Sequence, residues 1–275
     1  MKLSEPRFVV NSVNTSVHHS ALVELHWPPQ SPAPELKEGE VHVICASLDV
    51  PGDRLAQLQS TLSMDELGRA ARFCFQSGKH HFVAARGLLR EVLGQYAGLP
   101  PRQVEFCYNA SGKPDLAGGA ARHGLHFNVA HSGADAVFAI TQCDAVGVDL
   151  ERMRAIPDML QMVAFALSER EKREWEKLEA SEWRRAFFDC WARKEAFLKG
   201  IGEGLQRPPG EIEVPLRQSD PEETLPIVDR GCEVNDWSLR SLSAGEYAVA
   251  VAVKGQPTRV SCWAWQPREE SHSAR

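Results

Sequence analysis

Long apolar runs are missing from this chain of 275 residues. The longest run near the C-terminus, Tyr247 to Val253, has the length of a strand and is much shorter than a membrane-spanning helix. The first eleven residues include Glu5 and Pro6 and no extended apolar core, so we expect no signal peptide. These absences predict a cytoplasmic protein that has no membrane partner.

Closely spaced cysteines and an excess of positive charge are also absent. The seven cysteines are scattered and never have the C-x-x-C spacing of a local zinc site, although a site assembled from distant residues stays open. Their odd number and wide spread favour mostly buried thiols in a reducing cytosol. The formal net charge of −6 argues against nucleic acid as a partner, so an anionic ligand would need local basic residues.

Two carboxylates lie close together in the segment Val146–Glu151. Apolar residues alternate with others there, which predicts a strand in which Asp149 and Glu151 share one face while Val148 and Leu150 share the other. Neighbouring carboxylates repel unless a cation or a proton lies between them, and Mg²⁺ is the usual cation where phosphates are bound. A solvated edge strand is the alternative that carries no function.

A helix that ends with Trp191–Lys199 presents further charges. Its apolar residues recur at helical spacing, and Glu195 and Lys194 lie on or beside the apolar stripe. Charges on a core-facing stripe are costly unless they are paired or bound to a metal. We infer that Glu195 joins the two strand carboxylates around one metal ion. The alternative is an exposed glutamate in i,i+4 contact with Lys199.

The two halves of the chain share a pattern. Val41–Ala46 precedes Val146–Glu151 by 105 positions (146 − 41), and the capping-box sequence at Ser63 precedes the one at Ser168 by 105 positions (168 − 63). A long amphipathic stretch follows each box, with Ala85-Arg86 in the first and Ala192-Arg193 in the second. We therefore predict a duplicated α+β fold with an N-terminal half at 1–144, including weakly patterned residues 1–40, and a C-terminal half at 145–275.

The duplication also separates folding from chemistry. Ile44 and Ala46 take the places that Asp149 and Glu151 take in the second copy (44 + 105 and 46 + 105). A strand at this place therefore needs no acids in order to fold, which favours a chemical role for the acids.

The remaining pattern predicts further elements. We expect a helix at His80–Tyr96, strands at Val104–Tyr108, Phe127–Gly133 and Asp135–Thr141, one helix from Ser168 to Ile201, an irregular excursion at 206–235, a closing pair of strands at Glu246–Lys254 and Arg259–Trp265, and a frayed tail at Gln266–Arg275.

Gly147-Val148-Asp149-Leu150-Glu151, followed by Trp191-Ala192-Arg193-Lys194-Glu195-Ala196-Phe197-Leu198-Lys199, resembles the signature pair of the Sfp-type 4'-phosphopantetheinyl transferases. The resemblance spans roughly Leu62 to Val214. It also includes, in the family's order, Ala85–Arg90, Gly112-Lys113-Pro114, Asn128–Ser132, and Leu167-Ser168 with Glu171.

The resemblance implies a pseudo-twofold fold of two similar α/β halves with coenzyme A bound between them. It implies an enzyme of the holo-[acyl-carrier-protein] synthase type, which transfers phosphopantetheine from coenzyme A to a serine of an acyl, peptidyl or aryl carrier protein. The other product is 3',5'-ADP. An internal pseudo-dimer makes a monomer natural.

Residue roles follow from the same resemblance. Asp149, Glu151 and Glu195 would hold Mg²⁺ against the pyrophosphate, and Glu171 or Glu195 would deprotonate the serine. Lys194 and Lys199 would meet phosphates or the leaving group, and Arg86, Lys113 and His131 would hold the 3'-phosphate and pyrophosphate.

Several alternatives stay open at this point. Glu171 can simply complete a capping box with Ser168, and Lys199 can be a solvated lysine in the last turn of its helix. Ala130 replaces a serine that is frequent in the family, and a few extra residues before Leu167 blur the position of Glu171. A metal-dependent phosphohydrolase and a non-enzymatic module that binds coenzyme A or a carrier protein are the rival functions.

Overall fold

The computed structural model describes residues 27–30, 33–220, 222–243 and 245–266. Most of the weakly patterned N-terminal stretch and nearly all of the expected tail (267–275) lie outside the described residues.

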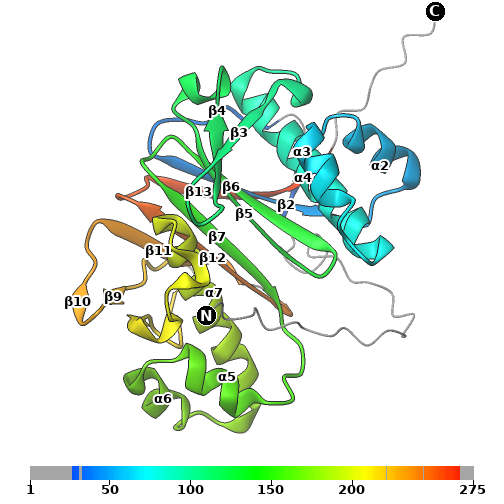
Figure 1. Cartoon of the computed structure of the whole chain (residues 1–275). Coiled ribbons are helices and arrows are strands. Elements are labelled where there is room, and N and C mark those ends of the chain that lie inside the picture. The colour runs from blue at the N-terminus through cyan, green and yellow to red at the C-terminus, as the bar shows by residue number, and fades with distance from the viewer. Residues whose placement is uncertain (1–26, 31–32, 221, 244, 267–275) are drawn as a thin grey trace, which may run out of the picture.

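Two mixed or antiparallel sheets form the centre of the molecule (Figure 1). The larger has the order β1-β13-β2-β6-β5 and the smaller the order β11-β12-β7. Their strands are β1 Pro29–Gln30, β2 Glu40–Ser47, β5 His126–Ser132, β6 Asp135–Thr141, β7 Val146–Arg152, β11 Trp237–Ser241, β12 Tyr247–Lys254 and β13 Arg259–Trp265.

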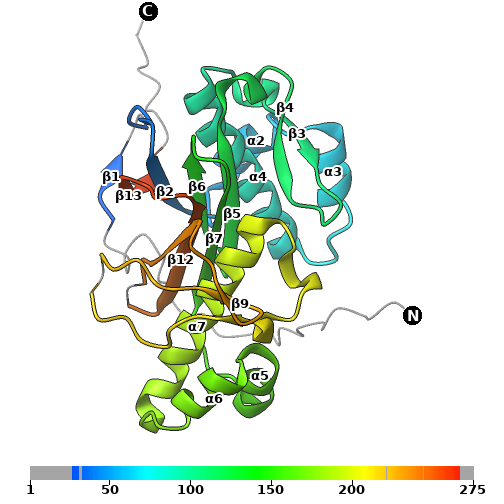
Figure 2. The same cartoon turned by 90° about the vertical axis from the view of Figure 1, so that its left-hand side faces the viewer.

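Helices cover the outer faces of these sheets (Figures 1 and 2). The helices α2 Gly52–Gln59, α3 Met64–Ala70 and α4 Gln76–Ala97 belong to the N-terminal half, and α5 Met159–Ala166, α6 Glu169–Trp175 and α7 Ala180–Ile201 to the C-terminal half. Short strands complete the fold: a hairpin of β3 Glu105–Tyr108 and β4 Pro114–Ala117, and a small sheet of β8 Ile212–Glu213, β9 Val228–Asp229 and β10 Cys232–Glu233.

The predicted duplication is present in the order of elements. Each half contains a strand, an eight-residue helix, a seven-residue helix with a capping box and a 22-residue helix, followed later by an antiparallel hairpin. The hairpin β5-β6 pairs with β2, and the hairpin β11-β12 pairs with β7. The chain therefore has the predicted α+β fold of two similar halves. The division at residue 144 stays a prediction, because β13 returns to pair with β2.

The core is layered between the helices and the sheets. Alternate residues of β2 and β7 point into a core shared by the two sheets, which includes Val43, Val148 and Leu150. Ile44 points the other way, toward α4. The opposite face of β7 points toward α7, so the strand that carries the two acids packs between a sheet and a helix.

Two expectations about the second half are wrong. The single helix expected from Ser168 to Ile201 is divided into α6 and α7. At the break, the buried Trp175 stacks on Trp183 with ring centroids 4.5 Å apart. The second helix has its own N-terminal cap, in which the Glu182 carboxylate accepts from the Glu179 N–H. The strands β12 and β13 both form, but they lie in different sheets and do not pair with each other.

The predicted offset of 105 is confirmed for the two capping boxes, at Ser63 and Ser168. The two long helices begin 104 positions apart (180 − 76), so Arg86 matches Cys190. The helices α2 and α5 and the strand β4 were missed because they are short and lack a clear periodic pattern. Among the described residues, no helix is long and apolar enough to cross a membrane.

Candidate active site

The strand β7 delivers Asp149 and Glu151 to one face, as its alternation predicts. Its other side chains at Val148 and Leu150 are buried between the sheets. On the neighbouring strand β12, alanines lie beside both acids: Ala250 is the register partner of Asp149 and Ala248 that of Glu151. Small side chains at those places leave room above the sheet for the carboxylates.

The helix α7 brings Glu195 and Lys199 to the same place. Lys199 Nζ donates to Asp149 Oδ1 over 2.6 Å. The side chain of Glu195 is only 6% exposed. The helix can come this close because its backbone touches β7 at Gly147, where an added Cβ would lie 2.0 Å from the carbonyl oxygen of Ala196. The structure thus pairs Lys199 with Asp149, and Glu195 and Glu151 lie close enough for the charge of Asp149 to act on both.

The electrostatics of the cluster show that negative charge is in excess. Burial and the neighbouring Asp149 raise the pKa of Glu195 to about 7, although Lys199 works in the opposite direction. The pKa of Glu151 is also raised to about 7, again by burial first and Asp149 second. Burial lowers the pKa of Lys199, but the adjacent carboxylates, Asp149 foremost, outweigh it and leave that pKa raised. One ammonium group therefore does not neutralise three carboxylates.

The residues present fit a divalent cation. Asp149 Oδ2 and Glu195 Oε1 are both buried without a hydrogen-bond partner, and buried oxygens in that state are costly. Carboxylate oxygens are the ligands that Mg²⁺ prefers. Within the described ranges, no group of three or more His, Cys, Asp or Glu side chains is already arranged to hold a metal, so the acids would need to adjust their rotamers around the ion.

The strand β5 supplies residues that the sequence analysis quoted but did not assign. Asn128 Oδ1 accepts from the Val148 N–H over 2.9 Å. Ser132 Oγ accepts from the Arg152 N–H over 3.0 Å and donates to Glu151 Oε2 over 3.2 Å. Asn128 and Ser132 thus join the edge strands of the two sheets beside the acids. Their place in the Asn128–Ser132 motif was the available signal.

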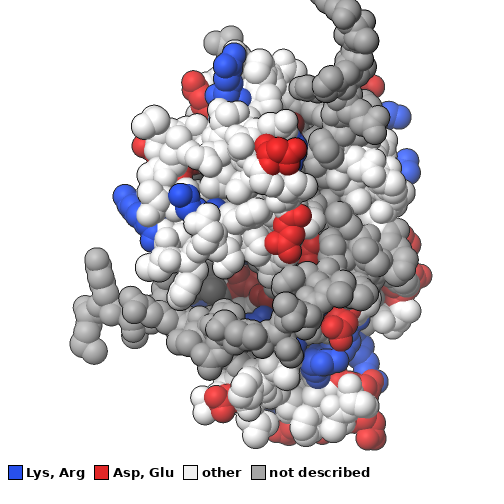
Figure 3. Space-filling view, turned by 90° about the vertical axis from the view of Figure 1, so that its right-hand side faces the viewer, with Lys and Arg blue, Asp and Glu red and all other residues white. Residues whose placement is uncertain are grey.

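A cavity of about 360 Å³ opens beside the cluster on the N-terminal half. Its lining includes Arg86, His131 and Tyr108. His131 follows Ala130 on β5, and surrounding protein atoms, then the charge of Lys199, lower its pKa. His131 therefore lines the cavity and is near enough to Lys199 and Asp149 for their charges to act on its pKa. On the face drawn in Figure 3, basic and acidic side chains are interspersed, and both colours are visible in a hollow near its centre.

Arg86 is held by the capping box of α3. Its Nε donates to Glu66 Oε1 over 2.6 Å, and an NH2 hydrogen goes to the Tyr108 hydroxyl at 3.1 Å. Arg90 shares the same carboxylate, and the Arg86 guanidinium lies 4.4 Å from the ring centroid of Phe106. The guanidinium is therefore fixed at the cavity wall before any ligand arrives.

Lys113 lies elsewhere. It follows the turn between β3 and β4, and its Nζ donates to the carbonyl oxygens of Val146 and Gly200 over 3.1 and 3.0 Å. It lines a separate cavity of about 230 Å³. Burial lowers its pKa to about 8.

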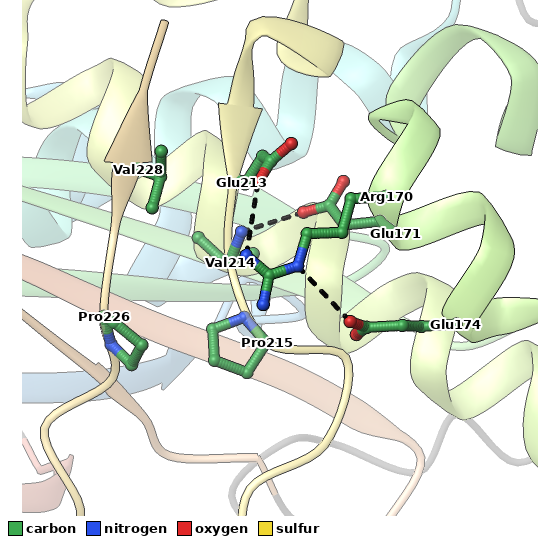
Figure 4. Close-up of a pocket in the computed structure, with 8 residues that line it drawn as sticks. All are labelled: Arg170, Glu171, Glu174, Glu213, Val214, Pro215, Pro226 and Val228. Atoms are coloured by element: carbon green, nitrogen blue, oxygen red, sulfur yellow. Dashed lines mark hydrogen bonds and ion pairs between the residues drawn. The ribbon is translucent and has the colours of Figure 1, made fainter. Parts of the chain in front are cut away.

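Glu171 and Lys194 also lie apart from the acid cluster and pair with each other. Glu171 Oε2 accepts from the Ser168 N–H over 2.7 Å and from Lys194 Nζ, while Oε1 accepts from the Val214 N–H over 2.8 Å. Figure 4 shows the contact between the Val214 N–H and the Glu171 carboxylate, next to the side chain of Arg170. The expected capping box is confirmed. Because Lys194 is fully buried, this pair is positioned to dock α6 on α7.

The family is established by sequence comparison. Residues 145–252 match the profile described as the 4'-phosphopantetheinyl transferase superfamily, and residues 51–143 match the one described as 4'-phosphopantetheinyl transferase, N-terminal. The chain belongs to the 4'-phosphopantetheinyl transferase superfamily.

Two relatives agree with this membership in sequence. The 4'-phosphopantetheinyl transferase HetI of Nostoc sp. is 37% identical over 88% of this chain and 96% of its own. A putative 4'-phosphopantetheinyl transferase of Synechocystis sp. is 32% identical over 70% and 76%. A crystal structure of a holo-(acyl-carrier-protein) synthase from Bacillus anthracis with CoA (3',5'-ADP) is 23% identical over 40% of this chain and 96% of that one, with a TM-score of 0.33.

Proposed function

We propose that this protein transfers the 4'-phosphopantetheine group from coenzyme A to a serine hydroxyl of an apo carrier protein, with Mg²⁺ as cofactor, as a holo-[acyl-carrier-protein] synthase does. The observation that carries the proposal is the cluster of Asp149, Glu151 and Glu195, in which Asp149 and Glu195 are buried and negative charge is in excess. The strand β5, which contacts Glu151 through Ser132, also lines the cavity that holds Arg86. The reaction forms a bond from serine Oγ to the phosphorus of the phosphopantetheine and breaks the bond from that phosphorus to the 3',5'-ADP oxygen.

Different residues of the chain are proposed to bind coenzyme A, to compensate charge on the leaving group and to hold the metal ion. Arg86 and His131 are proposed to hold the phosphates of coenzyme A in the cavity, and Lys199 is proposed to offset charge on the leaving group. A bound Mg²⁺ would be held by Asp149, Glu151 and Glu195, and it would neutralise negative charge on the pyrophosphate.

Glu195 is the better candidate for accepting the serine proton. Its Oε1 lacks a partner, whereas both oxygens of Glu171 are engaged by backbone N–H groups and Lys194. A general base needs a free lone pair within reach of the hydroxyl. We therefore assign Glu171 and Lys194 to holding α6 in place. They correspond to Glu66 of the first capping box (66 + 105) and to Arg90 of the first long helix (90 + 104).

The partner we propose is an acyl, peptidyl or aryl carrier protein. Carrier proteins are commonly acidic, so contact with a chain of net charge −6 needs a local basic or apolar patch. On α5, Leu160 is 70% and Phe165 54% exposed, and we propose that this helix offers the carrier protein apolar contacts. The duplicated fold supports a monomer, and the seven free cysteines support a reducing cytoplasm.

The test is the intact mass of several apo carrier proteins after incubation with this protein, coenzyme A and Mg²⁺. We expect a gain of one phosphopantetheine that a chelator abolishes. Asp149→Ala should abolish the gain without loss of the fold, because Ile44 occupies the matching place in the first half. Coenzyme A cleaved without a carrier would instead support a phosphohydrolase, and coenzyme A bound but left intact with every carrier would support a binding module.

A further inference from the structure

One lysine joins the strand and the helix that carry the acid cluster. Lys113 comes from the N-terminal half, yet both of its hydrogen-bond acceptors belong to the C-terminal half. Val146 is the first residue of β7, three residues before Asp149. Gly200 lies in the last turn of α7, one residue after Lys199. The ammonium group therefore bridges β7 and α7 at the end of the site.

The Gly200 carbonyl group needs a hydrogen-bond donor from outside its helix. The last carbonyl groups of a helix have no partner within it, and a cation there is favoured by the helix dipole. The turn between β3 and β4, which carries Lys113, makes another contact at this helix end: Asn109 Nδ2 donates to the Gly202 carbonyl oxygen over 3.4 Å. Asn109 Oδ1 also accepts from the Lys113 N–H over 2.8 Å, so the turn that presents the lysine is itself fixed.

The bridge lies where the spacing of strand and helix is most constrained. A Cβ added to Gly147 would lie 2.3 Å from the Gly200 nitrogen, so the two backbones are already in contact. A small change in this contact would move Asp149 relative to Glu195. Metal-binding carboxylates depend on such supporting contacts for their orientation.

The lysine does not face the cavity proposed for coenzyme A. Gly112 lines that cavity together with Arg86 and His131, whereas Lys113 lines the smaller cavity on the other side of the turn. Within the described ranges, no carboxylate lies within ion-pairing distance of its Nζ. Its observed contacts are thus the two carbonyl groups.

We propose that Lys113 is a positioning residue that fixes the spacing between β7 and α7, and thereby the geometry of the metal-binding acids. The proposal rests on the proposed function of that site. It differs from the direct contact with the 3'-phosphate or pyrophosphate that the family resemblance implies for Lys113, and the two roles have different consequences.

The experiment compares Lys113→Met with the matched control Lys37→Met, which removes an exposed lysine of the same half. Three quantities are measured: the ratio of affinities for coenzyme A and for coenzyme A lacking its 3'-phosphate, both without metal; the Mg²⁺ concentration for half-maximal carrier modification; and amide hydrogen exchange in β7 and the last turn of α7.

A positioning role predicts an unchanged affinity ratio, a Mg²⁺ requirement raised roughly 10–100-fold, and faster exchange in both segments. The control should match the wild type in all three. If the affinities for coenzyme A and for coenzyme A lacking its 3'-phosphate become equal in Lys113→Met, while the Mg²⁺ requirement and the hydrogen exchange stay unchanged, the proposal is overturned in favour of a phosphate contact. If Lys113→Met does not fold, Lys113→Gln is measured in the same way.

Failure of the proposed function is distinguishable from failure of this inference. If the wild-type protein modifies no carrier, the proposed reaction is wrong, whereas the exchange comparison still reports whether Lys113 holds β7 and α7 together. Unchanged exchange in Lys113→Met and Lys113→Gln, in a protein that does modify carriers, would refute the positioning role alone.

Discussion

Replacing Glu195 with glutamine should stabilise the metal-free protein at alkaline pH while removing its activity. The carboxylate is 6% exposed, and burial together with Asp149 raises its pKa to about 7 from the ordinary 4.5. A group with a raised pKa in the folded state binds its proton more tightly there than in the unfolded chain. It therefore favours folding below about pH 4.5, and this contribution is lost as the pH rises through about 7.

The magnitude follows from the size of the shift. A change of about 2.5 pKa units corresponds to roughly 3 kcal/mol, at about 1.4 kcal/mol per unit. Glutamine stays neutral, and its amide can donate to Asp149. We expect Glu195→Gln to gain up to about 3 kcal/mol in the free energy of unfolding at pH 8.5, and less than about 0.5 kcal/mol at pH 4.5. The nearby acids titrate together, so the gain belongs to the cluster as a whole.

The assay is urea unfolding in the presence of a chelator at both pH values, with Glu176→Gln as the control. Glu176 is exposed, so its replacement should have little effect at either pH. Adding Mg²⁺ at pH 8.5 should stabilise the wild type more than Glu195→Gln. A variant that is destabilised equally at both pH values would refute the reasoning, because the carboxylate would then be well accommodated in its charged form.

Three further substitutions test the surroundings of the cluster. Gly147→Ala should destabilise the fold by about 3 kcal/mol or more, since its Cβ would lie 2.0 Å from a carbonyl oxygen of α7; a normal urea midpoint would contradict that contact. Lys194→Met should cost about 3–5 kcal/mol by leaving Glu171 buried without its cation, and Lys194→Met with Glu171→Gln should recover part of this loss if the pair is structural. Ser132→Ala should lower the free energy of unfolding by about 1–3 kcal/mol, because the buried hydroxyl accepts a backbone N–H and donates to Glu151. The Mg²⁺ concentration for half-maximal carrier modification should also rise in this variant. An unchanged concentration would show that Ser132 does not orient Glu151.

The two similar halves differ at the positions that carry Asp149 and Glu151. The strands β2 and β7 have equivalent places in the two halves, and Asp149 and Glu151 of β7 match the apolar Ile44 and Ala46 of β2. Ile44 packs against α4 as part of an apolar core, while Asp149 faces α7 and a lysine. The same scaffold thus supports an apolar core in one half and a charged cluster in the other.

Local pattern was enough to predict the elements that carry the site. Alternation placed Asp149 and Glu151 on one face of a strand, and helical spacing placed Glu195 near them, because both periodicities are properties of the backbone itself. The capping boxes at Ser63 and Ser168 were equally readable, since each depends on a serine and a glutamate three residues apart.

Contacts between distant segments were not predictable in this way. The sequence offered Glu171 and Glu195 as equal candidates for the base, and it did not show that both oxygens of Glu171 take part in the docking of α6. Lys113 gave no local signal for its contacts with Val146 and Gly200, because those carbonyl groups are brought to it by the packing of the two halves.

The sequence by itself determined which residue types recur at strand and helix spacing, and through them the duplicated α+β fold and the strand and helix that carry Asp149, Glu151 and Glu195. Only the tertiary structure decided which charges meet. Lys199 pairs with Asp149, Lys194 with Glu171, and Arg86 with Glu66. The physical reason is that the preferences of a strand or a helix act over a few residues, whereas the cost of burying a charge depends on every group that packs around it.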